Sequence, residues 1–284
     1  MVVVGSRTGR KAGGLRQPAK VAAAIGISAL AAASFGAAWI RPAGYAAQFR
    51  EAPTLAPCAR FPLGTDELGR DLLARTLYGM RLSFVLAGSA ALVSSAVAGL
   101  AGVATGVFGT TFEQVLEIGS NLLMSLPWLF LLLLVRALMP LEMPAEASVV
   151  VTFLLLALLG WAPAARVIGA AARSLRHSGF TLRARAEGAG SWRLIRHQLW
   201  PNLRPLIVSQ FLILLPGFIL SEATLSFLGL GVGEPLPSWG GLLRDLEDYS
   251  AVAEQPWRVA PLVLMFLTVA CLQSLASENA RRKV

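Results

Sequence analysis

Six apolar segments alternate with polar and charged segments along the chain. They cover residues 21–40, 83–109, 119–138, 147–164, 205–228 and 259–277. A helix needs about 20 mainly apolar residues to cross the hydrocarbon core of a bilayer. The pattern therefore predicts an all-α, polytopic membrane protein with six transmembrane helices.

The first apolar segment has two interpretations, because basic residues precede it: Arg7, Arg10, Lys11, Arg16 and Lys20. It resembles a cleaved signal peptide, but its apolar run is longer than the roughly 7–15 residues typical of such peptides. We therefore expect an uncleaved helix at 21–40 after a tail at 1–20. An outer loop at 41–82, a core transmembrane domain at 83–277 and a tail at 278–284 should follow.

Small residues are frequent in the second apolar segment, where Gly99, Gly102 and Gly106 follow one another at helical spacing. Small residues allow helix backbones to approach closely in lipid. The spacing predicts either tight packing in a bundle or a helix that lines a path and moves against a neighbour, and the two are compatible.

Composition agrees with a membrane protein and excludes several other classes. Of the 284 residues, 55% are hydrophobic and 14% are charged, and the mean hydropathy is +0.63. The formal net charge of +9 does not indicate nucleic-acid binding, because no basic groove interleaved with aromatic residues is visible. Cys58 and Cys271 lie in very different settings, so neither a disulfide framework nor a metal cluster is expected.

The charged residues are distributed unevenly between the apolar segments. With the N-terminus inside, the inner segments (1–20, 109–117, 164–204 and 278–284) hold 16 of the 25 Lys and Arg residues. Cytoplasmic segments of membrane proteins carry an excess of Lys and Arg. The distribution therefore predicts that both termini and the loop at 164–203 are cytoplasmic.

The 164–203 loop is rich in arginine and lies between two long apolar segments. It is too long for a simple turn and too short for a domain, which suits docking to a soluble partner. Near its centre, Gly188 permits a positive φ or a close backbone approach. We expect two short helical pieces to meet there at an angle.

The second of these helical pieces has an amphipathic pattern. Trp192, Ile195 and Leu199 recur at three- and four-residue spacing, with Arg193 and Arg196 beside them. Such a face can lie in a groove of another protein. It can also lie on the membrane surface, with its arginines at anionic headgroups, and the pattern leaves both interpretations open.

Residues 184–202, ARAEGAGSWRLIRHQLWPN, resemble the "EAA" loop of ABC importer permeases. More narrowly, they resemble the second (C-type) subunit of dipeptide, oligopeptide and nickel permeases. Gly188 and Pro201-Asn202 match the family pattern. Leu182 and Arg183 stand where the name of the motif places Glu and Ala, so this loop is more basic than usual.

Two further segments resemble the same family and occur in the expected order. One is 64–71, GTDELGRD, and the other is 221–231, SEATLSFLGLG, which is followed by PSWG at 237–240. Three ordered landmarks are far more specific than one. The resemblance implies a permease of the type I ABC importer fold in the bacterial cytoplasmic (inner) membrane.

The resemblance also implies partners and a mechanism. The chain would pair with a second homologous permease subunit, cytoplasmic ABC ATPase subunits that bind ATP and Mg²⁺, and an extracytoplasmic substrate-binding protein. It would bind no cofactor itself, and its cargo would be a peptide, nickel or a related small solute. ATPase closure would act through the loop at 183–200. The coupling residues would be Arg183, Ala184, Arg185, Glu187, Gly188, Trp192, Arg193, Ile195 and Arg196.

The segment before the second apolar run is predicted to be a short helix on the outer side. Thr65 or Asp66 can cap it, and the pairs Asp66–Arg70 and Asp71–Arg75 have i,i+4 spacing. We expect this segment, residues 64–81, mainly to fix the angle of the following span; direct contact with the substrate is the alternative.

Glu222 is the only acidic residue within a predicted span. Intramembrane carboxylates usually face the protein interior or a water-filled cavity. With Ser209, Gln210 and Ser226, it can form a polar side of a translocation path. Alternatively, it reaches the outer headgroups or bonds to a neighbouring helix.

The sequence has no phosphate-binding loop of the Gly-x-x-x-x-Gly-Lys-Ser/Thr type and no catalytic Ser/His/Asp arrangement. We therefore expect a non-catalytic subunit without a metal site. One alternative is a secondary transporter driven by an ion gradient, but this class commonly has internal repeats and ionisable groups at the midplane. Another is a membrane anchoring or assembly protein, which would not explain the docking loop.

Overall fold

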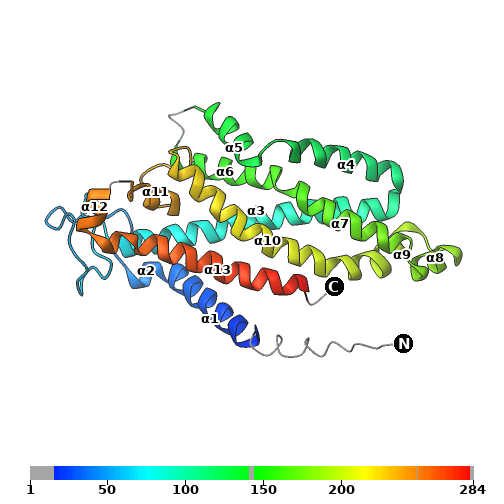
Figure 1. Cartoon of the computed structure of the whole chain (residues 1–284), viewed down its shortest axis with the longest axis horizontal. Helices are drawn as coiled ribbons and strands as arrows, with labels where there is room; N and C mark the ends of the chain where they lie inside the picture. The colour runs from blue at the N-terminus through cyan, green and yellow to red at the C-terminus, as the bar shows by residue number, and fades with distance from the viewer. Residues whose placement is uncertain (1–15, 141–143, 248, 282–284) are drawn as a thin grey trace, which may run out of the picture.

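The computed structural model describes residues 16–140, 144–247 and 249–281, which form a bundle of long α-helices (Figure 1). The helices are α1 (Arg16–Phe35), α2 (Ala37–Ile40), α3 (Leu72–Phe108), α4 (Thr110–Ser125), α5 (Trp128–Ala137), α6 (Ala145–Leu159), α7 (Trp161–Arg176), α8 (Gly179–Ala186), α9 (Ser191–Leu194), the π-helical η1 (Ile195–Leu199), α10 (Trp200–Phe227), α11 (Trp239–Arg244), α12 (Tyr249–Glu254), the 3₁₀-helical η2 (Pro256–Val259) and α13 (Ala260–Arg281). No β-strand occurs within the described ranges, which confirms the all-α prediction.

All six predicted apolar segments are helical. Four helical stretches are long and apolar enough to cross a membrane: Leu72–Phe108, Ala145–Arg176, Ser191–Phe227 and Pro256–Ser277. The pair α4 and α5 passes the same test together but is bent by 71° at its break, and Val21–Phe35 of α1 is a shorter apolar helix. The structure therefore supports a multi-pass protein, in which the third predicted span (119–138) is broken and the first one (21–40) is short.

Several helices extend beyond the predicted boundaries. α3 begins at Leu72 rather than at residue 83, so there is no separate short helix before it. The helix predicted to end at 164 continues to Arg176, because one face of α7 packs against α3 and α4. Of the predicted tails, residues 16–20 and 278–281 are helical, whereas 1–15 and 282–284 lie outside the described residues.

α3 is the central helix, and its small residues allow α7 and α10 to pack closely against it. A Cβ atom added to Gly99 would lie 2.8 Å from Ile207 Cδ1, and one added to Gly102 would lie 2.9 Å from Ile168 Cβ. A Cβ at Gly106 would lie 2.8 Å from Leu199 Cδ1. The predicted tight packing is confirmed, because larger side chains at these positions would separate the helices.

The helices α8 and α11 lie at opposite ends of the bundle (Figure 1). The α8 end consists of the turn at Gly109 and residues 177–190, and the α11 end consists of residues 41–71 and 228–258. α1 and α13 both extend from the α11 end toward the α8 end.

Candidate functional site

The turn after α8 has the geometry that the sequence predicted around Gly188. Gly188 has φ +79°, and its N–H donates to Arg185 O (3.0 Å), while Ala189 N–H donates to Ala184 O (2.9 Å). These two bonds form a Schellman motif, which ends a helix with a left-handed residue. A Cβ at Gly188 would have no atom within 4 Å, so the requirement for glycine within this chain is conformational.

The helix after Gly188 differs from the prediction. Ser191–Phe227 form one helical stretch, with α9, η1 and α10 in direct succession. The predicted docking stripe does not face outward as a unit, because Leu199 is 1% exposed and packs on α3, and Ile195 is partly buried in the same cluster. Only Trp192 of the stripe is exposed, at 71%. Leu199 packs against α3 because Gly106 has no side chain at the point of contact.

The surface that α8 and α9 present is therefore composed of different residues. Phe180 and Leu182 of α8 are 45% and 51% exposed, and Trp192 lies beyond the Gly188 turn. We call these three residues, together with the hollow between α8 and η1, the α8–α9 surface. The hollow has a volume of about 220 Å³, and its walls are Ala184, Glu187, Ala189, Arg193, Leu194, His197 and Gln198.

Arginines of the predicted loop differ in their contacts. Arg183, Arg193 and Arg196 are exposed and make no ion pair within the described residues. Arg185 turns back and donates to Gly106 O near the end of α3 (3.3 Å). Arg173 bonds to α4 through two glutamates, at 2.7 and 3.0 Å. Arg183, Arg193 and Arg196 therefore leave their charges available to a partner at the α8 end.

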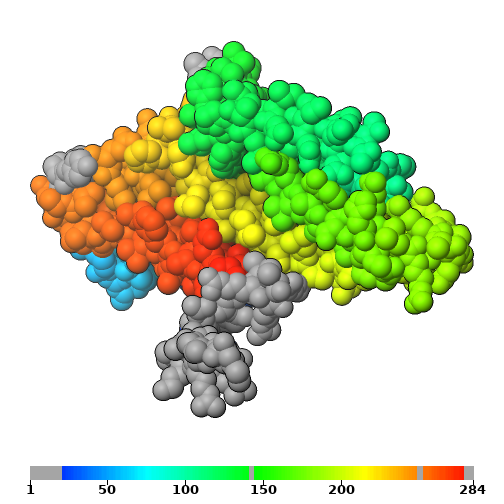
Figure 2. Space-filling model, turned by 45° about the vertical axis from the view of Figure 1, so that its right-hand side comes forward, coloured from blue at the N-terminus to red at the C-terminus, as the bar shows by residue number. Residues whose placement is uncertain are grey.

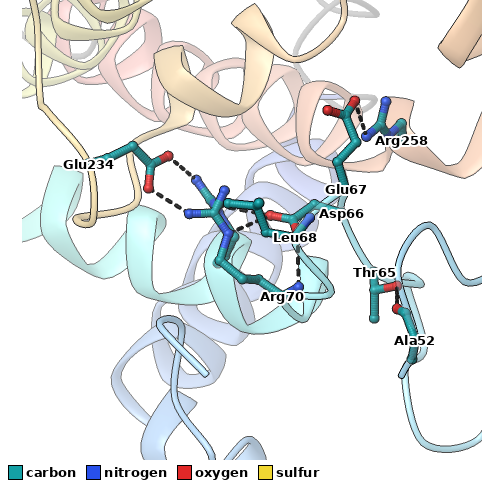
Figure 3. Close-up of polar contacts among 9 residues, drawn as sticks. Ala52, Thr65, Asp66, Glu67, Leu68, Arg70, Glu234 and Arg258 are labelled. Carbon is teal, nitrogen blue, oxygen red and sulfur yellow. Dashed lines mark hydrogen bonds and ion pairs between the residues drawn. The ribbon is translucent and has the colours of Figure 1, made fainter. Parts of the chain in front are cut away.

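At the α11 end, residues 64–71 are held by an ion-pair cluster whose Asp66 and Arg75 side chains are buried (Figure 3). Arg70 and Arg75 each bridge Asp66 and Glu234, at distances between 2.6 and 3.0 Å. Asp66 also accepts the backbone N–H groups of Leu68 (3.0 Å) and Arg70 (2.8 Å). We call Asp66, Arg70, Arg75 and Glu234 the four-residue cluster. It joins the start of α3 to the segment between α10 and α11.

The i,i+4 prediction in this segment is confirmed for one pair and wrong for the other. Asp66 and Arg70 form an ion pair, but within a turn rather than a helix. Asp71, not Thr65 or Asp66, caps the helix, because its carboxylate accepts from Leu73 N (2.9 Å) and Ala74 N (3.3 Å). Its ion-pair partner is Arg41, and not Arg75.

The electrostatics of the cluster follow from burial and pairing. Burial acts to raise the pKa of Glu234, but the hydrogen bonds and charges of Arg75 and Arg70 outweigh it, so this pKa lies below its ordinary value. Burial acts to lower the pKa of Arg70, and the bonds to Asp66 and Glu234 more than reverse the effect. Glu234 and Arg70 are therefore both charged near neutral pH.

Glu222 faces the bundle and not the lipid or the headgroups. It is 1% exposed, and Ser226 Oγ donates to its Oε1 atom (2.7 Å). The side chains of Ser83 in α3 and Ser238 before α11 lie beside the same carboxyl group. Its Oε2 atom is buried and has no hydrogen bond within the described residues. Glu222 thus lies where α3, α10 and α11 meet.

The structure does not bring the four predicted path residues into one site. Glu222 and Ser226 lie together near the α11 end, linked by their hydrogen bond. Ser209 and Gln210 lie four turns away on the same helix, where they line a groove of about 680 Å³ between α7 and α10. Their role in transport stays a prediction.

Sequence reasoning missed Arg41 and Glu234 as partners of the 64–71 segment. Both are far from it in sequence, since the Arg75–Glu234 bond spans 159 residues. Glu234 follows the glycine-rich end of α10, and nothing in the local pattern marks it as the acid that two arginines share. In the described residues, no group of three or more His, Cys, Asp or Glu side chains is arranged to hold a metal.

Comparison with known proteins defines the class of protein that this fold represents. Residues 98–282 match the family described as the inner membrane component of binding-protein-dependent transport systems, and the chain belongs to this family. It is therefore a multi-pass inner membrane permease component rather than an enzyme. The sequence left three functions open: importer subunit, secondary transporter, and membrane anchoring or assembly protein. The family membership agrees with the importer subunit.

The curated relatives are more specific. The chain is 33% identical over 191 residues to the dipeptide transport system permease protein of Bacillus subtilis, a match that covers 67% of this chain and 58% of that protein. It is 31% identical over 209 residues to the oligopeptide transport system permease protein of Haemophilus influenzae, covering 73% and 65%. The di/tripeptide transport system permease protein of Pseudomonas aeruginosa is 31% identical over 232 residues, covering 80% and 74%. The match thus covers less than two thirds of the length of the first two relatives.

Proposed function

We propose that this chain is one of two permease subunits of an ATP-driven importer of peptides. The observation that carries this proposal is the match to relatives that are named as dipeptide, oligopeptide and di/tripeptide permeases. These names favour a peptide over nickel as the cargo. The other members of the transporter would be a second permease subunit, cytoplasmic ATPase subunits that bind ATP and Mg²⁺, and an extracytoplasmic binding protein.

The α8–α9 surface is the docking site for the ATPase in this proposal. It offers three exposed apolar side chains, a hollow, and unpaired arginines at positions 183, 193 and 196. Exposed large apolar residues rimmed by charges are typical of interaction sites. The α8 end is then cytoplasmic, in agreement with the excess of Lys and Arg in the inner segments.

The continuous helix from Ser191 to Phe227 gives this docking site a direct mechanical link to the membrane. A displacement of α9 moves α10, because no loop separates the two. Within α10, Pro205 and Pro216 are the points where a helix bends most readily. ATPase closure would thus tilt α10 against α3 and α7 and alternate the access of the path.

Reconstitution of the chain with the products of adjoining transporter genes tests the proposal. Proteoliposomes should take up a labelled tripeptide only with ATP and the binding protein, and the ATPase should co-purify with the membrane subunits. Uptake of nickel but not peptide would refute the proposal that the cargo is a peptide. Uptake driven by an ion gradient without ATP would refute the ATP-driven mechanism.

The assignment of the docking site has its own test. A Trp192→Ala, Leu182→Ala double variant removes two exposed apolar groups, and Leu228→Ala (52% exposed, near the α11 end) is the matched control. The double variant should release the ATPase during purification, whereas the control should retain it. Retention in both variants would place the docking site elsewhere.

A further inference from the structure

α7 and α10 enclose a large groove between them. Figure 2 shows the two helices side by side, α10 in yellow and α7 in green. The groove has a volume of about 680 Å³, within the roughly 300–1,000 Å³ of small-ligand pockets. Val167 and Leu206 are among its apolar walls, and Ser209 and Gln210 line it within the span predicted at 205–228.

Gln210 is a polar side chain without a partner in this groove. It is 9% exposed, and it makes no hydrogen bond within the described residues. Its amide atoms are not among the buried, unpaired polar atoms, so they remain accessible from the groove. The neighbouring polar groups differ, because Ser209 Oγ donates to Pro205 O (2.9 Å) and Asn202 Nδ2 donates to Gln198 O (2.6 Å).

Lipid cannot satisfy the amide of Gln210. A primary amide has two N–H donors and a carbonyl acceptor, and leaving them unpaired away from water is unfavourable. Polar groups inside a membrane therefore face protein, water or a ligand. The groove places this amide where a solute can reach it.

The chemistry of the amide selects between two occupants of the groove. A neighbouring transmembrane helix satisfies its backbone N–H and C=O groups internally, so it offers only side chains. An extended peptide has free backbone N–H and C=O groups, which complement both sides of a glutamine amide. We propose that the α7–α10 groove is a transient contact site for peptide cargo, where the Gln210 amide hydrogen-bonds to the peptide backbone. This inference rests on the proposed import of peptides.

The test uses the complete transporter in proteoliposomes with a labelled tripeptide that carries a photoreactive side chain. During ATP-driven uptake, cross-links should map to residues 167–213 of this chain. Gln210→Leu keeps the volume and removes both hydrogen bonds, so the cross-link yield should fall about tenfold. Gln210→Asn should recover part of the yield. Thr268→Val is the matched control, because its hydroxyl is bonded within α13 (2.8 Å to Leu264 O) and lies outside the groove.

Three results would overturn the inference. The first is uptake in which the cross-links map to other helices, and the second is a yield that Gln210→Leu leaves unchanged. The third is an Ile213→Cys side chain that forms a disulfide with a cysteine on the second permease subunit in the resting transporter, since the groove is then filled by protein. The wild-type transporter is measured first. If it takes up no peptide, the proposed function fails and the inference fails with it, whereas normal uptake with a negative cross-linking result overturns the inference alone.

Discussion

The four-residue cluster at the α11 end predicts that Asp66→Asn destabilises the protein strongly, although the two side chains have the same shape. Asp66 accepts bonds from Arg70 Nε (2.7 Å) and Arg75 Nη1 (3.0 Å) through one oxygen, and from two backbone N–H groups through the other. Asparagine can serve one set only. Its NH₂ group would then point at the N–H groups of both arginines, donor against donor.

The expected magnitude follows from burial. The side chains of Asp66 and Arg75 are 7% and 3% exposed, and removing one partner of a buried ion pair costs about 3–5 kcal/mol. The side chain of Glu234 is 61% exposed, so Glu234→Gln should cost about 1 kcal/mol or less. Glu67, whose side chain is 71% exposed and pairs with Arg258, provides the matched control, and Glu67→Gln should cost close to nothing.

Thermal unfolding in detergent, followed by tryptophan fluorescence, measures the loss of stability in the three variants. The midpoint should fall most for Asp66→Asn, slightly for Glu234→Gln and hardly at all for Glu67→Gln. Cysteine labelling at the α8 end of each variant checks that the rest of the bundle is intact. If Asp66→Asn unfolds at the wild-type temperature, or if Glu67→Gln is the most damaging change, the cluster does not hold the α11 end together.

The remaining predictions concern pH, coupling, Glu222 and topology. Because the pKa of Glu234 lies below its ordinary value, the stability that its ion pairs contribute should be present above about pH 4.3 and disappear as the pH falls further. A difference in unfolding midpoint between wild type and Glu234→Gln that persists to lower pH would contradict this. Gly188→Ala should cost about 1–2 kcal/mol because of its positive φ, and it should weaken co-purification of the ATPase more than Gly188→Asn, a residue that tolerates this conformation; equal retention would refute the role of the turn. Glu222→Leu should impair assembly or transport well beyond Glu222→Gln, since only the latter keeps a hydrogen bond to Ser226, and equal activity of the two would remove this residue from the path. In intact cells and in a Cys58→Ser background, which removes the exposed native thiol, a membrane-impermeant thiol reagent should label cysteine at Gly241 but not at Ser191. Labelling at Ser191 would invert the topology.

The local pattern of the sequence determined the helical class and the places where helices cross or turn. Apolar runs of bilayer length leave few alternatives to a helix, because a lipid-exposed backbone must satisfy its own hydrogen bonds. The turn at Gly188 could be predicted from local chemistry as well, since glycine adopts a positive φ without strain. The three small residues of α3 likewise predicted close packing, and they lie against side chains of α10, α7 and η1.

What the tertiary structure decided is which side of each helix faces the protein. Trp192, Ile195 and Leu199 have one helical spacing, yet Leu199 is buried because Gly106 of α3 lies opposite, while Trp192 extends beyond the bundle. Glu222 was compatible with lipid or protein until α3 and α11 were seen to enclose it. Glu234 became part of a cluster only because the chain returns to α3 after 159 residues. Periodicity describes a helix relative to itself, whereas burial and pairing depend on neighbours that are distant in sequence.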